Sequence, residues 1–345
     1  MMLRTAVIGV GHLGRQHARI HAALAAEDQA QFVAVCDLNE RTARAVASEY
    51  HAASNIPSNT IINNKSETEW TVEWRTLIGR VDAVSLAVPT EMHAAIACPL
   101  LEAGIHVLVE KPISRTLEEA DQMIAAAARG NAVLQIGHLE RFNPALIALR
   151  PFVRNPLYFE IHRIGQFTAR SLDIDVVLDL MIHDLDIVQW LVGENVEVTD
   201  VRAVGIPVLT NRVDAANARL EFASGAVANI TASRVGTEKI RKMRFFQPHD
   251  YIAVDYATHY ASISNLAPPD AASVNLTPVA WPGVHVRRLE TIDIEPLRAE
   301  IEAFLKAVRF GSSPPVSAHE GRRALALALR TLDRIAEHSV GTGIT

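Results

Sequence analysis

The sequence predicts an α/β protein with two domains, the first built on a doubly wound parallel sheet and the second on an antiparallel or mixed sheet. The chain has 345 residues, more than one hydrophobic core usually organises. Up to about residue 137, short apolar runs alternate with helix-like stretches, as in repeated β-α-β units. Beyond that point, apolar and polar residues alternate singly, as in half-buried strands. We therefore expect domains at 1–137 and 138–345.

The strands of the first domain are nearly continuous apolar runs, as expected when a parallel sheet is buried on both faces. They are TAVIGV, FVAVCD, AVSLAVP, HVLVEK and VLQIGH. Helical patterns separate them: LGRQHARIHAALAA, ERTARAVASEY, EMHAAIACPLLEAG and TLEEADQMIAAAAR, the last opening on the capping-box pair Thr116 and Glu119. The polar stretch 51–70 is expected to form a surface excursion. The ligand site of such a sheet lies at the carboxyl ends of its strands.

The second domain begins its regular alternation with ANARLEFAS and GAVANITAS, which a Ser-Gly turn joins as a hairpin. Further strand-like runs follow: KIRKMRFFQ, DYIAVDYA, HYASISN and VRRLETIDI. An almost wholly apolar helix is expected over 176–192, and a Pro-rich loop over 265–283. Two helices, over 296–310 and 319–338, close the chain.

Composition narrows the classes of protein to which the chain can belong. Hydrophobic residues make up 49% and charged residues 21%, as in soluble globular proteins. The net charge of −6 argues against nucleic-acid binding, which needs a basic surface. Only Cys36 and Cys98 are present, so no disulfide framework is expected and a reducing cytoplasm fits. No signal peptide and no apolar run long enough for a membrane span are apparent.

A glycine-rich turn follows the first strand and leads into a helix. VIGVGHLG has the G-x-G-x-x-G spacing, in which the glycines allow a tight turn, a close approach of a pyrophosphate and close helix packing. The predicted cofactor contacts in this turn are Gly9, Gly11, His12, Leu13 and Gly14.

Asp37 ends the second strand, 23 residues past Gly14. A carboxylate at this place accepts a hydrogen bond from a ribose 2′-hydroxyl and repels a 2′-phosphate, which favours NAD over NADP. Arg41 lies close enough to leave NADP possible. The alternative is an ordinary turn followed by a helix-capping Asp.

Glu110, Lys111 and Pro112 follow a predicted buried strand at the ligand edge of the sheet. A lone Lys there is more often a snorkelling surface residue. However, G-x-G-x-x-G, AVPTEMH, EKP and the D-x-x-x-H pattern of Asp179 and His183, in this order, resemble the Gfo/Idh/MocA family of nicotinamide-dependent oxidoreductases. The resemblance covers nearly the whole chain.

The resemblance implies a Rossmann domain followed by an α/β domain with a large open, mostly antiparallel sheet. That sheet often mediates oligomerisation, so a homodimer or homotetramer is expected. A sugar or polyol would lie over the nicotinamide, with Lys111 contacting the reacting hydroxyl and His183 as acid/base beside Asp179. The residues implied near the cofactor are Pro89, Thr90, His93, Glu110 and Lys111.

The spacing within 176–192 independently supports this chemistry. Asp179 and His183 are four residues apart and so share a helix face, which Asp186 joins at seven. A neighbouring Asp fixes the tautomer of an imidazole that removes a hydroxyl proton while hydride leaves the same carbon. Lys111 would stabilise the alkoxide. Asp184, off that face, is expected to be solvated or to cap the helix. The alternative is a structural Asp–His pair; no third ligand suggests a metal.

The runs GHLERFNPAL and HRIGQFTAR, with this helix, resemble the branch of the family that contains UDP-N-acetylglucosamine 3-dehydrogenases. That resemblance implies oxidation of the sugar 3-hydroxyl to a ketone for later amination, toward lipid A. A diphosphate suits bidentate arginine donors, and Asn143 suits a hydroxyl or acetamido group. The candidate donors are Arg141, Arg163 and Arg170, although each alone is more often an ion-pair or surface residue.

A second basic cluster lies in EKIRKMRFFQ. If this run is a strand, Lys239 and Arg241 share one face and Lys242 and Arg244 the other, which offers either an anion surface or a solvated face or subunit interface. Three alternatives to the nucleotide-sugar enzyme remain open. They are a dehydrogenase of a free sugar or inositol, a glycosidase that uses tightly held NAD, and an NAD-binding regulatory protein.

Overall fold

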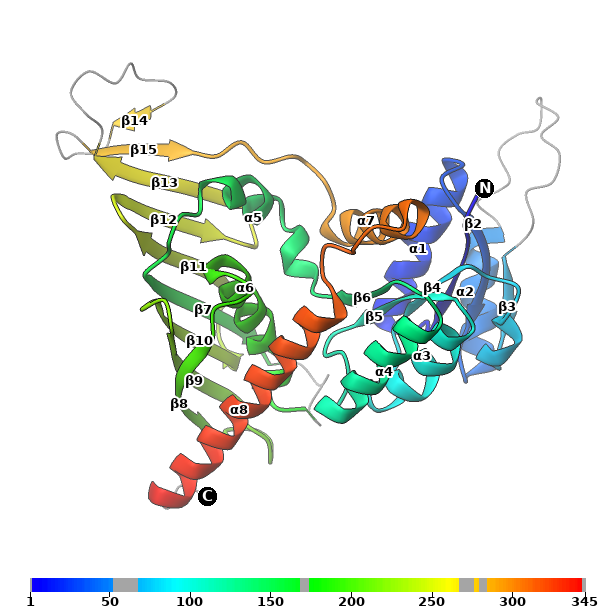
Figure 1. Ribbon diagram of the computed structural model, residues 1–345, viewed down its shortest axis with the longest axis horizontal. Coiled ribbons are helices and arrows are strands. Elements are labelled where there is room, and N and C mark those ends of the chain that lie inside the picture. Colours follow the sequence, from blue (N-terminus) through cyan, green and yellow to red (C-terminus); the bar gives the residue numbers. More distant parts are fainter. Residues whose placement is uncertain (1, 52–67, 168–173, 267–275, 279–283, 343–345) are drawn as a thin grey trace. The chain divides into compact units, whose positions relative to one another are not determined.

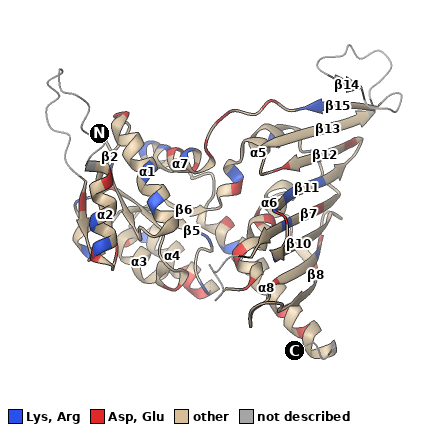
Figure 2. Cartoon of the chain, turned by 180° about the vertical axis from the view of Figure 1, so that it is seen from behind, with Lys and Arg blue, Asp and Glu red and all other residues tan. Residues whose placement is uncertain are grey.

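The computed structural model describes residues 2–51, 68–167, 174–266, 276–278 and 284–342. Two compact units divide the chain (Figure 1). Unit 1 comprises Met1–His138 and Leu297–Arg322, and unit 2 comprises Leu139–Pro296 and Arg323–Thr345. Both units carry interspersed acidic and basic residues along their described parts (Figure 2).

Unit 1 is built on a six-stranded parallel sheet in the order β3-β2-β1-β4-β5-β6, as the doubly wound prediction requires. Its strands are β1 (Arg4–Ile8), β2 (Gln31–Cys36), β3 (Glu69–Thr71), β4 (Ala83–Leu86), β5 (His106–Glu110) and β6 (Leu134–Gly137). The order reverses between β1 and β4, which is where ligands bind in sheets of this type. The Rossmann prediction is therefore confirmed.

The helices of unit 1 join consecutive strands. They are α1 (His12–Ala26), α2 (Glu40–His51), α3 (His93–Glu102) and α4 (Leu117–Arg129). α3 and α4 pack side by side, and α1 packs against α2 (Figure 1). Thr116 caps α4 as predicted, its side chain accepting from the backbone N of Glu119 at 3.2 Å. Much of the stretch expected as a surface excursion lies outside the described residues, but Glu69 and Trp70 belong to β3.

Unit 2 is built on a nine-stranded sheet in the order β14-β15-β13-β12-β11-β7-β10-β9-β8. All its pairs are antiparallel except β7 with β10, so the predicted mostly antiparallel sheet is confirmed. The strands are β7 (Tyr158–Gln166), β8 (Val198–Ile206), β9 (Ala215–Phe222), β10 (Val227–Gly236), β11 (Ile240–Gln247), β12 (Asp250–Asp255), β13 (Tyr260–Leu266), β14 (Leu276–Pro278) and β15 (Val284–Arg288).

Helices cover one face of this sheet and bury its main core. They are α5 (Pro144–Leu149), α6 (Ile182–Val192) and the part of α8 (Ala318–Thr342) that belongs to unit 2. The helix expected over 176–192 has a wider first turn, because Val177–Met181 (η6) is π-helical and α6 continues from it. Within the expected loop at 265–283, residues 276–278 form β14.

The remaining long helix, α7 (Pro296–Phe310), belongs almost wholly to unit 1 rather than to the second half of the chain. Arg298 pairs with Glu27 after α1, at 2.5 Å between Nη2 and Oε2. The boundary between the units then falls inside α8, after Arg322. We expected two consecutive domains divided at 137/138. That division did not anticipate that residues 297–322 belong to unit 1.

Candidate functional site

The glycine-rich turn joins β1 to α1. Gly9 has a φ of +81°, and a Cβ on it would lie 2.6 Å from the carbonyl oxygen of Ala87. A Cβ on Gly14 would lie 1.7 Å from the Gly9 oxygen, so neither position admits a side chain. At Gly11, in contrast, an added Cβ would meet no described atom within 4 Å. The turn therefore packs tightly against β4 but leaves space beside Gly11.

The N-terminus of α1 opens onto that space. Gly11 is its N-cap, and no described side chain caps the helix or places an acidic group in its first turn. His12 and Leu13 are exposed there. The first amide N–H groups of a helix need acceptors and carry a partial positive charge. These residues fit the pyrophosphate of a dinucleotide.

Asp37 lies directly beside the glycine-rich turn. Its Oδ2 accepts a hydrogen bond from the Val10 amide and its Oδ1 from the Asn39 amide, each at 2.9 Å. A carboxylate has about four acceptor positions, so two remain for ribose hydroxyls. Arg41 is exposed on α2, where it lines a shallow pocket with Arg44 and Ser48. Asp37 thus lies beside the glycine-rich turn with acceptor positions to spare, and its contact with a ribose stays a prediction.

His93 braces the edge of the sheet rather than facing solvent. It is buried, with Nδ1 3.1 Å from the Pro112 oxygen and Nε2 3.0 Å from the Val88 oxygen. Burial lowers its pKa, although the three neighbouring carbonyls oppose this effect. His93 therefore ties the segment after β4, where Pro89 is exposed and Thr90 half-buried, to the segment after β5.

Glu110 ends β5 and contacts a residue that the sequence reasoning missed. Its Oε1 lies 2.8 Å from Nε2 of the buried His17, on α1, and its Oε2 accepts from the Lys111 amide at 3.3 Å. Burial opposes ionisation of Glu110. The hydrogen bond and charge of His17, together with the charge of Lys111, outweigh burial and lower the pKa of Glu110. Glu110 thus fixes the backbone of Lys111. His17 could have been identified from its position three residues after Gly14, on the buried face of α1.

Glu300 on α7 is a second carboxyl group in this part of unit 1. It is fully buried, and neither of its side-chain oxygens has a described hydrogen-bond partner. Burial raises its pKa well above the usual value, and the charge of Glu110 raises it further. The Glu300 backbone oxygen accepts from Gln135 on β6 at 3.3 Å. Burial and the charge of Glu110 therefore both favour the neutral form of Glu300.

The ionisable residues of 176–192 fall into two kinds. Asp179 lies in the π-helical turn and His183 in the first turn of α6, and both are half-buried. Turns of this kind occur frequently at functional sites. Asp184 and Asp186 are fully buried. The prediction that Asp184 is solvated or caps the helix is therefore wrong.

Asp184 and Asp186 are each held by a buried arginine. Arg163 donates from Nε and Nη2 to Asp184 at 2.7 and 2.8 Å, and from Nη1 to Glu140 at 2.8 Å. Arg141 donates from Nε and Nη2 to Asp186 at 2.7 and 2.6 Å. Bidentate pairs of this kind use the donors that a diphosphate would need. The geometry therefore favours the ion-pair alternative for both arginines.

Asn143 and Arg170 are the other two residues predicted to contact the diphosphate or sugar of the substrate. Asn143 is buried; its Oδ1 accepts from the Ala145 amide at 3.1 Å as the N-cap of α5, and its Nδ2 donates to the backbone oxygen of Tyr256 at 3.1 Å. Its polar atoms thus serve the fold. Arg170 lies outside the described residues. Contact of either with a substrate stays a prediction.

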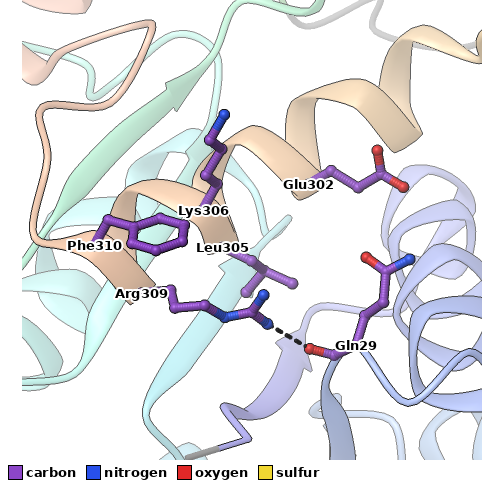
Figure 3. Close-up of a pocket in the computed structure, with 6 residues that line it drawn as sticks. All are labelled: Gln29, Glu302, Leu305, Lys306, Arg309 and Phe310. Carbon is purple, nitrogen blue, oxygen red and sulfur yellow. Dashed lines mark hydrogen bonds between the residues drawn. The ribbon is translucent and has the colours of Figure 1, made fainter.

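A surface pocket of about 290 Å³ lies on unit 1 between α7 and the segment after α1 (Figure 3). Arg309 donates across it to the backbone oxygen of Gln29 at 2.7 Å. None of the sequence-predicted site residues lines it. Within the described residues, no group of three or more His, Cys, Asp or Glu is arranged to hold a metal, and no helix is long and apolar enough to cross a membrane.

Comparison with protein families matches two regions of the chain. Residues 3–138 match the Gfo/Idh/MocA oxidoreductase family, described as an NAD-binding Rossmann fold. Residues 119–246 match the Gfo/Idh/MocA C-terminal domain. These regions contain the glycine-rich turn, Lys111 and the segment 176–192.

Among curated proteins, UDP-N-acetylglucosamine 3-dehydrogenase of Acidithiobacillus ferrooxidans is 39% identical over 329 residues, 95% of this chain and 96% of that protein. Inositol 2-dehydrogenase of Rhizobium meliloti is 26% identical over 351 residues, 98% of each.

Among solved structures, UDP-N-acetylglucosamine 3-dehydrogenase GnnA of A. ferrooxidans matches with a TM-score of 0.85 and 38% identity, over 97% of this chain and 98% of that one. Levoglucosan dehydrogenase in complex with NADH and levoglucosan has a TM-score of 0.79 and 20% identity, over 98% of each chain, and shows the shared fold.

Proposed function

The chain belongs to the Gfo/Idh/MocA family of NAD-binding oxidoreductases, and on this basis we propose that it oxidises the 3-hydroxyl of UDP-N-acetylglucosamine. One observation carries the choice of substrate: the 39% identity to the A. ferrooxidans enzyme extends over 95% of this chain and 96% of that one. Inositol 2-dehydrogenase matches over as much of the chain but at 26% identity.

The residues of unit 1 provide for the cofactor. The N-terminal amides of α1 would bind the pyrophosphate, and Asp37 would accept hydrogen bonds from a ribose. Pro89 and Thr90 would border the nicotinamide, with His93 holding their segment in place. NAD, when bound, supplies the acceptor for the hydride.

The chemical step needs a base and a cation at the reacting hydroxyl. His183 would remove the hydroxyl proton, and Asp179 would orient the imidazole and stabilise its charged form. Lys111 would stabilise the alkoxide that forms. Glu110 and His17 would keep the Lys111 backbone fixed, because preorganised charges need no rearrangement during the reaction.

The product would be a 3-keto nucleotide sugar. A ketone at that carbon is a substrate for an aminotransferase, and the resulting amino sugar would feed lipid A with amide-linked acyl chains. These reactants are intracellular metabolites, so we place the enzyme in the cytoplasm. We also propose a homodimer or homotetramer associated through the face of the nine-stranded sheet opposite α5 and α6, which light scattering coupled to gel filtration would test.

The experiment is to follow NADH absorbance with purified protein, NAD and UDP-N-acetylglucosamine, with an aminotransferase and amine donor present to remove the ketone. Steady NADH formation is expected, and N-acetylglucosamine and myo-inositol should give little. Turnover of inositol but not of the nucleotide sugar would establish the second candidate, the inositol dehydrogenase that the relative at 26% identity suggests.

A further inference from the structure

Arg241 is a half-buried cation near the start of β11. Among the described residues no carboxylate lies within 4.0 Å of its guanidinium, and no side-chain hydrogen bond ties it. The other basic residues of β11 differ. Lys242 lies 3.8 Å from Asp255, and Arg244 pairs with Glu160.

Strand geometry places Arg241 on the face that carries the helices. Arg241 lies directly opposite Arg163 in the antiparallel pairing of β11 with β7, and residues opposite each other project to the same face. Arg163 is on the helix-covered face, because it binds Asp184 of α6. Met243 and Phe245, two and four residues on, lie in the core beneath those helices. Lys242 and Arg244 project to the other face.

The described surroundings of Arg241 include a second cation but no carboxylate that binds its guanidinium. Two cations directly opposite each other in a sheet repel. Arg163 is satisfied by Asp184 and Glu140, whereas Arg241 is influenced by both acids without binding either. Burial and the charge of Arg163 lower the pKa of Arg241. A cation removed from water without a bound partner is unfavourable unless an anion completes the site.

Arg241 lies near the part of α6 that contains His183, the proposed acid/base. Arg241 lies opposite Arg163, which binds Asp184 in the first turn of α6, and Asp184 directly follows His183 in the chain. Lys239 stands two residues before Arg241 and is exposed, without a described ion-pair partner. Guanidinium groups donate two parallel hydrogen bonds to phosphate oxygens, so this cation suits a diphosphate better than a neutral sugar.

We propose that Arg241, with Lys239 beside it, binds the diphosphate of the nucleotide-sugar substrate, an assignment that rests on the proposed function. It replaces Arg141 and Arg163, whose donors already bind carboxylates. The unpaired guanidinium thereby distinguishes nucleotide sugars from free sugars.

The test is calorimetric binding of UDP to the full-length protein and to the variants Arg241→Met and Arg244→Met. Arg244→Met is the matched control, because it removes the same side chain from the other face of the same strand. Arg241→Met should weaken UDP binding by about tenfold or more, as expected for loss of a hydrogen-bonded charge, whereas Arg244→Met should bind within about twofold of the wild type. A third variant, Arg241→Lys, keeps the charge and should bind with intermediate affinity.

Kinetics on the same variants separate this inference from the proposed function. Arg241→Met should raise the KM for UDP-N-acetylglucosamine and leave kcat within about threefold, since uniform binding is lost. Unchanged UDP affinity and KM in Arg241→Met, with active wild type, would overturn the assignment alone. A wild type that binds no UDP would overturn it as well. A wild type that binds UDP but does not oxidise the nucleotide sugar would overturn the function instead.

Discussion

Four ionisable residues within one almost apolar segment have different roles, and burial separates them. Asp184 and Asp186 are fully buried and bound to arginines, so they anchor α6 to its surroundings. Asp179 and His183 remain half-buried in and after the π-helical turn. The buried ion pairs hold the helix in place, and in the proposed mechanism the half-buried Asp179 and His183 would carry out the proton transfer.

Replacing His183 by Ala should reduce kcat by about 10²- to 10⁴-fold, the usual contribution of a positioned general base. NAD binding, measured by fluorescence titration, should be unchanged because the cofactor residues belong to unit 1. His162→Ala, an exposed histidine on β7, is the control. Full turnover by the His183 variant would remove it from the acid/base role.

Replacing Asp184 by Asn should destabilise the folded protein by about 3–5 kcal/mol, because Arg163 would keep its buried charge without its main partner. Asp200→Asn breaks an exposed, solvent-screened pair with Arg202 and should destabilise the protein far less. Urea unfolding of the two variants compares these values. Equal small effects would show that the buried pair is not required for stability.

Asp37→Ala should raise the KM for NAD by about tenfold, the effect of losing a hydrogen bond to a charged group. The KM for NADP should rise less, because removal of the carboxylate also removes its repulsion of a 2′-phosphate. Steady-state kinetics with each cofactor measure both values, with Glu40→Ala as the control. Equal increases for the two cofactors would contradict the ribose contact.

α7 brings a fully buried carboxyl group, that of Glu300, into the core of unit 1. The folded pKa of Glu300 lies above its ordinary value of 4.5, so the folded protein holds a proton that the unfolded chain releases. By linkage, the contribution of Glu300 to stability is complete below about pH 4.5 and is lost as the pH rises toward the folded pKa.

Glu300→Gln cannot titrate, so its melting temperature relative to the wild type should increase with pH. At pH 8.5 the variant should melt higher by about 2 °C or more, as a change near 1 kcal/mol produces in a chain of this size. The difference should shrink toward pH 5. Glu302→Gln, on the same helix but partly exposed, is the control. A constant difference for Glu300→Gln would mean that its carboxyl ionises normally in the folded protein.

The regular elements were largely predictable, because continuous and alternating apolar patterns distinguish the two sheets. Local sequence patterns did not predict elements that depend on neighbouring strands or on a local irregularity of the helix. The three-residue strands β3 and β14 are too short for a period and are defined by their neighbours, β2 and β15. The π-helical turn adds a local irregularity to an otherwise helical pattern. α5 is a six-residue helix whose Asn143 cap resembled a ligand residue.

Contacts between residues far apart in the sequence could not be predicted. Candidate site residues could be identified by type and spacing, but the commitment of Arg163 to Asp184 and Glu140 depends on how β7, η4 (Leu139–Phe142) and α6 pack. The same holds for His17 with Glu110, separated by 93 residues, and for the return of 297–322 to unit 1. A linear sequence pattern does not encode which of the described arginines bind carboxylates and which, like Arg241, do not.

In the proposed reaction, hydride passes from carbon 3 of UDP-N-acetylglucosamine to NAD. The most direct measurement uses the substrate deuterated at carbon 3 and determines the mass of the NADH formed. Transfer of one deuterium to the cofactor is predicted, with none from substrate deuterated at carbon 4. Unlabelled NADH from the 3-deuterated sugar, or label arriving from carbon 4, would contradict the proposed reaction.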